Sequence, residues 1–322
     1  MINSRDLSIF KTLPKQAMPI LNSVKFEKNK ASMTDLEMAI TVKLQNDTRA
    51  LIPFEVLKKL RSFEILDDHT ISDGSRVIGI KDPLSVKDFP IIKHVPRGKL
   101  EKLPVDVLRT CLKHVSEDES RPALNHVLVS SKGLTGTDGH SLYWHRKSIP
   151  GIPELLLPPR PLKAILKCSG DSIGIRYDDN LITLSATNHV VTFKRPDLTF
   201  PDFEKVVPKK YEQIDVNTRE LISKCTSMLP FSNELTHCVK MTMEKQTMSL
   251  HSSNDNTEAS DSIPCSSRVT GEIGFNIELL RRLPDDSKIG FCHDGSQVEC
   301  QRPLVAESSD DIILVMPLRL AA

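Results

Sequence analysis

The chain repeats part of itself at a spacing of about one hundred residues, and this repeat limits the possible folds most. Asn22 follows Pro-Ile-Leu, and Asn125 follows Pro-Ala-Leu 103 residues later. Asp35 and Asp138, each preceded by a threonine, are separated by the same 103 residues. Solenoid units are shorter, about 20 to 50 residues, so this period is that of a whole domain. The sequence therefore predicts tandem copies of one domain.

The ends of the copies indicate where the domains divide. The first copy ends with a segment from Phe89-Pro90 to Val95-Pro96, and the second ends with a similar segment from Phe200-Pro201 to Val207-Pro208. The rest of the chain is about one more period, and it opens on Ile-Asp-Val-Asn at 214–217, similar to Leu-Pro-Val-Asp at 103–106. We therefore predict three similar domains, at residues 1–98, 99–208 and 209–322.

The composition is that of a globular protein without a membrane segment. A length of 322 residues allows two or three domains with cores of their own. The sequence has no apolar run of about 18 residues and no export signal, so we expect a cytoplasmic protein. The seven cysteines form no Cys-x-x-Cys pair and are expected to be reduced, without a metal ion. No nucleotide-binding motif is present, so no cofactor is expected.

Hydrophobic periodicity predicts an α+β fold. Two segments rich in β-branched residues, 181–184 and 189–193, are expected to form a hairpin. Helices are expected where apolar residues recur every three or four positions, at 54–61, 105–115, 160–168, 218–229 and 276–283. With a short amino-terminal helix expected before Pro19, each domain would then place two helices against antiparallel strands.

The polar faces of these helices are basic. They carry twelve basic and four acidic residues, although the whole chain has 43 basic and 42 acidic residues. Arg109 with Lys113, and Lys163 with Lys167, are four positions apart and share a helix side. Repeated faces of one sign favour binding to a polyanion; the alternative is a chance enrichment that depends on the chosen helix limits. Since aromatic residues make up only 5% of the chain, we expect phosphate contacts without base stacking.

A catalytic site is not expected. Asp138, His140, Ser141 and His145 lie close together in the sequence and could suggest hydrolytic or metal chemistry. On a predicted strand, however, His140 and His145 are five positions apart and point to opposite faces. The first copy repeats the Thr-Asp pair at 34–35 without a histidine, which favours a structural turn.

Several segments of the chain resemble one known family. They are Leu21, Thr34-Asp35-Leu36-Glu37-Met38, Thr137-Asp138-Gly139-His140-Ser141-Leu142, the stretch from Phe200 to Pro208, Ile273-Gly274-Phe275-Asn276 and Val315-Met316-Pro317-Leu318-Arg319-Leu320. In these segments, which follow the family's order over essentially the whole chain, the sequence resembles the bacterial sliding clamp, the beta subunit of DNA polymerase III. The resemblance implies three tandem DNA-clamp domains and a head-to-tail homodimer that forms a ring of six domains.

The resemblance gives the basic helices a role. It implies that helices line the hole of the ring, which encircles double-stranded DNA and slides along it through weak, salt-sensitive phosphate contacts. The residues expected to face the DNA are Lys15, Lys58, Arg109, Lys113, Arg121, Lys163, Lys167, Arg219, Lys224 and Arg281. The residues expected at the dimer interface are Phe89 on one side and Met228, Leu229 and Phe231 on the other. Residues 1–98 carry a net charge of +4 and residues 209–322 a net charge of −5, which favours head-to-tail pairing.

The resemblance also implies a peptide-binding pocket between the second and third domains. It would bind a linear motif of the DNA polymerase III alpha subunit, of the clamp loader complex and of other clamp-binding proteins. The lining implied by the family is Leu124, Thr137, Gly139, His140, Leu142, Pro201, Val206, Asn276, Val315, Met316, Pro317, Leu318 and Arg319. Ser141 and Lys205 stand where the family often has arginine, and Leu279 where an aromatic residue is common, so an altered motif preference is expected.

The function implied is that of a sliding clamp, a non-catalytic processivity factor that tethers the replicative polymerase. The alternative is a clamp-related adaptor that has lost ring closure or polymerase tethering and binds only peptides. The mass of the protein in solution separates the two. The chain continues beyond Leu320 as Ala321-Ala322, near the expected pocket.

Overall fold

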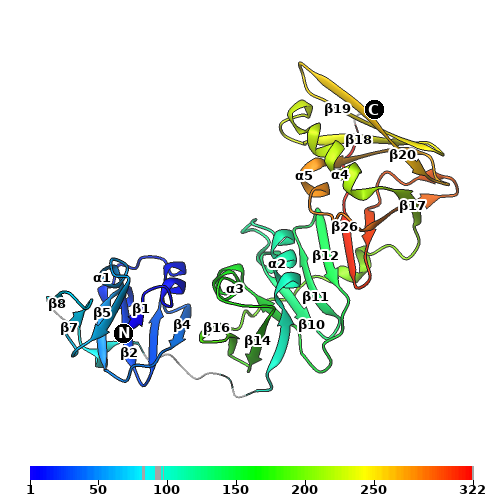
Figure 1. Ribbon diagram of the computed structural model, residues 1–322. Helices are drawn as coiled ribbons and strands as arrows, with labels where there is room; N and C mark the ends of the chain where they lie inside the picture. Colours follow the sequence, from blue (N-terminus) through cyan, green and yellow to red (C-terminus); the bar gives the residue numbers. More distant parts are fainter. Residues whose placement is uncertain (82–83, 91–95, 97, 321–322) are drawn as a thin grey trace. The chain divides into compact units, whose positions relative to one another are not determined.

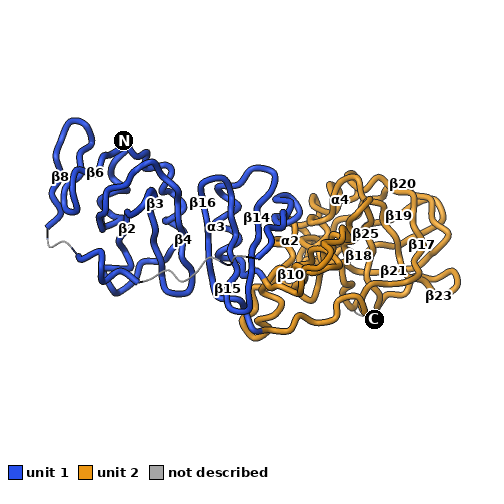
Figure 2. The backbone as a smooth tube through the Cα atoms, turned by 90° about the horizontal axis from the view of Figure 1, so that it is seen from below, with its two compact units in different colours: residues 1–109, 157–197 blue, residues 110–156, 198–322 orange. Residues whose placement is uncertain are grey.

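The computed structural model describes residues 1–81, 84–90, 96 and 98–320, and these residues form two compact units (Figure 2). The first unit comprises residues 1–109 and 157–197, and the second comprises residues 110–156 and 198–322. Two parts of the sequence discussed above lie outside the described residues: Val95, in the segment that ends the first repeat, and the terminal Ala321-Ala322. Each unit is built around one long antiparallel sheet.

The first unit contains a sheet of eight strands. Their order is β5 (Ala50–Pro53), β2 (Ser23–Glu27), β3 (Lys30–Thr34), β4 (Met38–Lys43), β16 (His189–Lys194), β15 (Leu181–Ala186), β14 (Ser172–Tyr177) and β9 (Glu101–Pro104). β4 and β16 pair from Met38 with Phe193 to Val42 with His189, so strands of the first and second predicted domains share this sheet. A smaller sheet has the order β1 (Ile2–Asn3), β6 (Ser62–Ile65), β7 (Thr70–Ser72) and β8 (Val77–Gly79).

Helix α3 (Pro159–Leu166) covers one face of the eight-stranded sheet, beside β15 and β16 (Figure 1). Pro159 and Pro161 stand in its first turn, where the backbone nitrogen needs no partner within the helix. Leu162 and Ile165 are fully buried, whereas Lys163 is exposed. The helix is therefore amphipathic, with its apolar side on the sheet and its basic side in solvent.

The second unit contains a sheet of twelve strands. Their order is β13 (Leu155–Leu157), β10 (Val127–Ser130), β11 (Gly133–Thr137), β12 (Ser141–His145), β26 (Asp311–Val315), β25 (Leu304–Glu307), β22 (Lys288–Phe291), β17 (Glu212–Val216), β20 (Glu258–Ser266), β19 (Thr247–Ser253), β18 (Cys238–Met243) and β21 (Gly271–Asn276). β12 and β26 pair from Ser141 with Val315 to His145 with Asp311. Strands of the second and third predicted domains therefore share this sheet. A separate pair consists of β23 (His293–Asp294) and β24 (Gln297–Val298).

The other helices are shorter than the sequence predicted. Those expected at 54–61 and 276–283 are single turns, α1 (Phe54–Leu57) and α5 (Ile277–Leu280), because apolar spacing continued into the loops that follow. α2 (Val105–His114) and α4 (Thr218–Ser227) match their predicted positions closely. Ahead of α1, the segment Ser8–Thr12 is a 3-10 helix. The α+β class and the hairpin of β15 and β16 are confirmed.

The repeat in the sequence corresponds to a repeated local structure. Thr34 ends β3 and its hydroxyl donates to the carbonyl oxygen of Met38 at 2.9 Å. Thr137 ends β11 and its hydroxyl donates to the carbonyl oxygen of Ser141 at 2.7 Å. The division into three domains at 98 and 208 stays a prediction, since continuous sheets cross both points and the compact units divide the chain elsewhere.

None of the helices in the described part of the chain is long and apolar enough to cross a membrane. Within the same residues, no group of three or more His, Cys, Asp or Glu side chains could hold a metal ion. All seven cysteines fall within this part and are free thiols.

Candidate functional site

Three segments that are far apart in the sequence meet in the second unit. They are the turn between β11 and β12, the strand β21, and residues 316–320 after β26, which we call the tail. The backbone N–H of Met316 donates to the carbonyl oxygen of His140 in the turn at 2.8 Å. The N–H of Leu318 donates to the carbonyl oxygen of Gly274 in β21, also at 2.8 Å. The tail is therefore hydrogen-bonded to both other segments, all of which the sequence assigned to the peptide pocket.

Side chains and a glycine shape the turn. Asp138 Oδ1 accepts from the backbone N–H groups of His140 at 2.8 Å and Ser141 at 2.6 Å. Gly139 has φ +87°, a left-handed conformation that glycine adopts without strain. A Cβ atom at this position would lie 2.8 Å from Arg121 Nη1 and 4.0 Å from Leu124 Cδ1. The Thr-Asp-Gly sequence thus determines a tight turn whose tip lies against Arg121 and Leu124.

Arg282, just beyond α5, holds this turn from the third predicted domain. Its Nη1 donates to Asp138 Oδ2 at 2.6 Å and to Ser141 Oγ at 2.8 Å. The side chains of Arg282 and Asp138 are only 28% and 15% exposed. Burial alone would raise the pKa of Asp138, but the Ser141 N–H and the Arg282 guanidinium together hold it below its usual value. The sequence reasoning counted Arg282 only as a basic helix residue and missed this contact.

A serine and a histidine also meet behind the turn. His114 Nδ1 of α2 lies 3.1 Å from Ser141 Oγ, and its ring stacks on Tyr143. Burial lowers the pKa of His114 to about 4, and the positive charge of Arg282 adds to this shift. Both His114 and Ser141 are buried, so a substrate has no access to the pair. The pair therefore gives no support to a hydrolase.

The histidines that the sequence considered are also separated. His140 lies in the turn, so its placement on a strand was wrong, because β12 begins only at Ser141. His145 Nδ1 lies 2.6 Å from Asp311 Oδ1 on the neighbouring strand β26. Asp311 also accepts from the Tyr143 hydroxyl at 3.0 Å. His145 therefore belongs to a cross-strand contact and does not meet His140 or Asp138 in a common site.

Some of the predicted pocket residues lie in the core. Leu142 and Val315 are almost fully buried, and Leu142 belongs to an apolar cluster with Phe200, Phe203 and Leu314. Asn276 is the N-cap of α5, where its side chain accepts from the Glu278 N–H at 2.8 Å. These residues have structural roles that account for their identity.

The remaining predicted pocket residues lie at or near the surface of the second unit. Exposed positions are Gly139, His140, Pro201, Val206 and Arg319, and half-buried positions are Leu124, Met316, Pro317 and Leu318. Thr137 is buried at the base of the turn. The hydrogen bonds described above bring the turn, β21 and the tail together. It stays a prediction that all these residues line one pocket.

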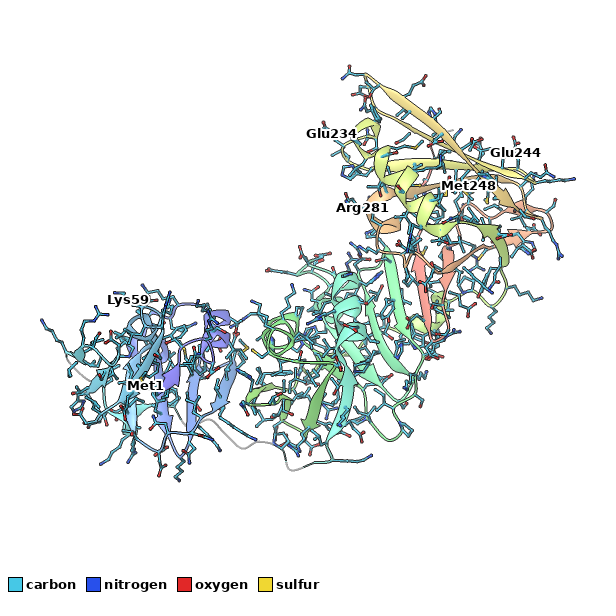
Figure 3. The ribbon with its side chains drawn as sticks, in the orientation of Figure 1. Met1, Lys59, Glu234, Glu244, Met248 and Arg281 are labelled. Carbon is cyan, nitrogen blue, oxygen red and sulfur yellow. The ribbon has the colours of Figure 1, made fainter. Side chains whose placement is uncertain are left out.

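The ten residues expected to face DNA divide equally between the units. The first unit holds Lys15, Lys58, Arg109, Lys163 and Lys167, and the second holds Lys113, Arg121, Arg219, Lys224 and Arg281. All are exposed except Lys224, which is half-buried. Figure 3 labels Arg281, just after α5, and also the basic residue Lys59, just after α1.

Many of these basic residues already form ion pairs. The pairs are Lys58 with Glu55, Arg109 with Asp106, Arg121 with Asp118, Arg219 with Asp285, Lys224 with Asp261, and Arg281 with Glu278. Lys15, Lys113, Lys163 and Lys167 pair with no acidic residue that the structure describes. Exposed pairs are weak and exchange readily with a phosphate. The four unpaired lysines are therefore the strongest candidates for DNA contact.

The residues expected at the dimer interface differ in exposure. Phe231 is 40% exposed and Leu229 is half-buried. Phe89 and Met228 are each only 3% exposed. A partner could therefore touch Phe231 and Leu229 directly, whereas Phe89 and Met228 are covered by their own chain. The interface itself stays a prediction.

Comparisons with known proteins agree with this arrangement. No model of a protein family matches the chain. The beta sliding clamp of Chlamydia pneumoniae is 25% identical over an alignment of 254 positions, which covers 73% of this chain and 69% of that protein. The DNA polymerase III subunit beta of Pseudomonas aeruginosa matches 99% of both chains with a TM-score of 0.81 and 18% identity. The sliding clamp of Bartonella birtlesii, solved bound to griselimycin, covers 99% of this chain and 98% of its own, with a TM-score of 0.81 and 21% identity.

The described residues thus have the fold of the sliding clamps, with antiparallel sheets and few helices. In sequence the chain is similar to bacterial beta sliding clamps, as the resemblance in its segments predicted.

Proposed function

We propose that the chain is a DNA sliding clamp. Two copies close head to tail into a six-domain ring around double-stranded DNA and tether the replicative polymerase to it. The observation that supports this most is the meeting of the tail, the β11–β12 turn and β21 in one unit of a sliding-clamp fold. The relatives bear the name beta sliding clamp, and one of them binds griselimycin.

Tethering depends on a peptide that binds beside the tail. Met316, Pro317, Leu318 and the exposed Val206 supply apolar atoms, and the exposed Arg319 supplies a polar anchor. Such a surface suits a short linear motif. The partners are the DNA polymerase III alpha subunit, the clamp loader complex and other proteins that carry a clamp-binding motif.

Retention on DNA is topological and needs no catalysis. Lys15, Lys113, Lys163 and Lys167 contact phosphates through their ammonium groups, which holds the duplex without reading its sequence. The protein is thus a non-catalytic accessory subunit that acts in the cytoplasm. Weak contacts let the ring slide, and the closed ring prevents its dissociation.

The test is retention on circular and linear DNA. The clamp is loaded by its own clamp loader onto a nicked circular plasmid, and the complex is isolated by gel filtration. Cutting the plasmid once should release the protein, because a ring slides off a free end. Replacing Lys113, Lys163 and Lys167 by Glu should shorten residence on the circle, whereas the control Lys209→Glu with Lys210→Glu should not. Equal retention before and after cutting would contradict a topological mode.

The same preparation separates the adaptor from the clamp. A clamp-related adaptor binds clamp-motif peptides as a monomer and is not retained on the circle. A dimer that stays on the circle and binds such peptides is a sliding clamp.

A further inference from the structure

A second basic site lies on the sheet of the first unit. It is a cavity of about 750 Å³ lined by residues of β2, β3, β4, β16, β15, β14 and β9 and by Phe89, Pro90 and Leu100. Thr183 and Ser185 line it, whereas Ile182 and Leu184, which alternate with them along β15, are fully buried in the core. Successive side chains of a strand point to opposite faces. The cavity therefore lies on the sheet face opposite to the apolar core and α3.

The cavity is strongly positive. Among the lining residues that the structure describes, Glu27 is acidic and six are basic: Lys25, Lys28, Lys30, Lys43, Lys102 and Arg176. Glu27 already forms ion pairs with Lys25 Nζ at 2.9 Å and with Arg49 Nε at 3.3 Å. The hydrogen bond from Lys25 lowers the pKa of Glu27, so this carboxylate is ionised and neutralised by its own neighbours. The whole chain has a net charge of only +1, so the positive charge is concentrated here.

Most of these basic groups form no ion pair within the described residues. Lys28, Lys30, Lys43, Lys102 and Arg176 form no ion pair with any acidic residue in the described part of the chain. Lys30 and Lys43 stand directly opposite each other in the antiparallel pair of β3 and β4. Like charges in this position destabilise a sheet. An anion bound between them would relieve that repulsion.

Hydroxyl groups form the floor of the cavity. Ser32 Oγ lies 3.1 Å from Thr41 Oγ1, and Thr183 Oγ1 lies 3.0 Å from Thr192 Oγ1. These four residues come from the adjacent strands β3, β4, β16 and β15. Each pair uses one hydroxyl hydrogen for its internal bond, which leaves the second hydrogen free for a ligand. The floor therefore offers neutral donors between flanking ammonium groups.

We propose that this cavity binds the phosphodiester backbone of single-stranded nucleic acid. Lysine and hydroxyl groups are the usual partners of phosphate oxygens. Carboxylates of an acidic peptide are matched best by the fork of arginine, and Arg176 is the one arginine among the lining residues that the structure describes.

The lining residues that the structure describes offer no platform for bases. Phe89 is the one aromatic residue among them; it is nearly buried, and Lys25 Nζ lies 5.9 Å from the centre of its ring. Binding is therefore independent of base identity, since stacking on aromatic rings is absent. Binding in the cavity is also separate from binding in the proposed hole, because the cavity lies on one face of the sheet and the basic side of α3 lies on the other.

The test measures binding of a short fluorescent oligo(dT) to the full chain by anisotropy over a series of salt concentrations. The variant combines Lys30→Glu with Lys43→Glu, which keeps like charges opposite each other in the sheet while it inverts their sign. The affinity should fall roughly tenfold or more, and the slope of log K against log salt should decrease by about 1.4, for two phosphate contacts at about 0.7 each. Circular dichroism checks that the variant folds.

Two control variants, one further variant and two competitors make the result specific. Lys209→Glu with Lys210→Glu, the same charge change at exposed lysines of the second unit, should leave affinity unchanged. Lys163→Glu on α3 together with Lys167→Glu just after α3 should also leave the affinity unchanged, which separates this site from the proposed hole. Thr41→Val, which removes a floor hydroxyl but keeps the shape, should weaken binding several-fold. An oligoglutamate of equal charge and a DNA duplex should compete poorly.

Three results would overturn the proposal. They are failure of the native chain to bind oligo(dT), equal binding by the Lys30/Lys43 variant, and equally strong competition by oligoglutamate or duplex. Strong competition by oligoglutamate would assign the cavity to an acidic peptide.

Discussion

Arg282 binds Asp138 in the second unit as Arg160 binds Asp35 in the first. In both units the aspartate follows a threonine that ends a strand, β11 or β3, and lies 103 residues from its counterpart. Each arginine belongs to the next predicted domain along the chain. The repeat therefore places an equivalent ion pair at each predicted domain boundary.

The pair of Arg282 and Asp138 should stabilise the second unit measurably. Replacing either by Ala leaves the other charge partly buried, and we expect a loss of about 1.5 to 3 kcal/mol in the free energy of unfolding. Asp138→Asn should cost less, since an amide oxygen still accepts from the N–H groups of His140 and Ser141. Urea unfolding of both single variants and the double variant measures the coupling. Strictly additive losses would show that the two side chains do not interact.

His114 should make the protein sensitive to mild acid. Its pKa is lowered by burial to about 4 from the 6.5 of an exposed histidine. A lowered folded-state pKa contributes stability that is complete above pH 6.5 and is lost as the pH falls towards 4. At 1.36 kcal/mol per unit, the loss is about 3 kcal/mol. His114→Gln should show a shallower fall of unfolding free energy over this range, and identical slopes would refute this assignment.

In the two equivalent turns, introducing a glycine and removing one should have opposite effects on the melting temperature. Leu36 has φ +77° at the position where the second copy has Gly139 with φ +87°. A side chain in this left-handed region costs about 1 to 2 kcal/mol. Leu36→Gly should therefore raise the melting temperature, because Leu36 is also exposed and loses no packing. Gly139→Ala should lower it. A lower melting temperature for Leu36→Gly would contradict this account.

Dimer formation should depend on Phe231. Its exposed ring belongs to the third predicted domain, and a charge there would have to be buried against a partner. Sedimentation velocity at micromolar concentration should show a dimer for the native chain and mostly monomer for Phe231→Asp. Leu198→Asp is a matched control, because Leu198 is also 40% exposed and lies in the same unit. A native chain that sediments as a monomer would exclude the ring.

Peptide binding should depend on the tail. A clamp-motif peptide should bind the native chain with a dissociation constant near micromolar, about −8 kcal/mol. Deleting residues 316–320 should abolish binding and leave the dimer intact. Gly274→Val tests the same site more gently, since a Cβ at Gly274 would lie 2.6 Å from Leu320 Cδ2 and 3.2 Å from Cys238 Sγ. Titration calorimetry should show weaker binding for this variant, and unchanged affinity would place the peptide elsewhere.

The sequence was sufficient for the repeat, the fold class and the amphipathic helices. These features depend on local patterns, such as the prolines that open α3 and the Thr-Asp pairs that make the turns. The resemblance to sliding clamps rested on short segments spread over the chain, and it was confirmed by matches that cover nearly all of it.

Contacts between distant residues could not be predicted in the same way. The bonds from Arg282 to Asp138 and from His114 to Ser141 join residues 144 and 27 positions apart. Nothing in the spacing of these residues indicates that they meet. The burial of Phe89 and Leu142 also follows from tertiary packing, as does the basic cavity, most of whose lining residues come from seven strands.

The shared sheets also determine how the protein can open. Ile40 in β4 faces Val191 in β16, so their amide hydrogens should exchange with deuterium as one cooperative unit although the residues are far apart in sequence. A fragment cut at residue 98 or 208 would leave β4, β16, β12 or β26 as a bare edge strand. Exposed edge strands pair with strands of other chains. Isolated single repeats should therefore aggregate, while the whole protomer should not.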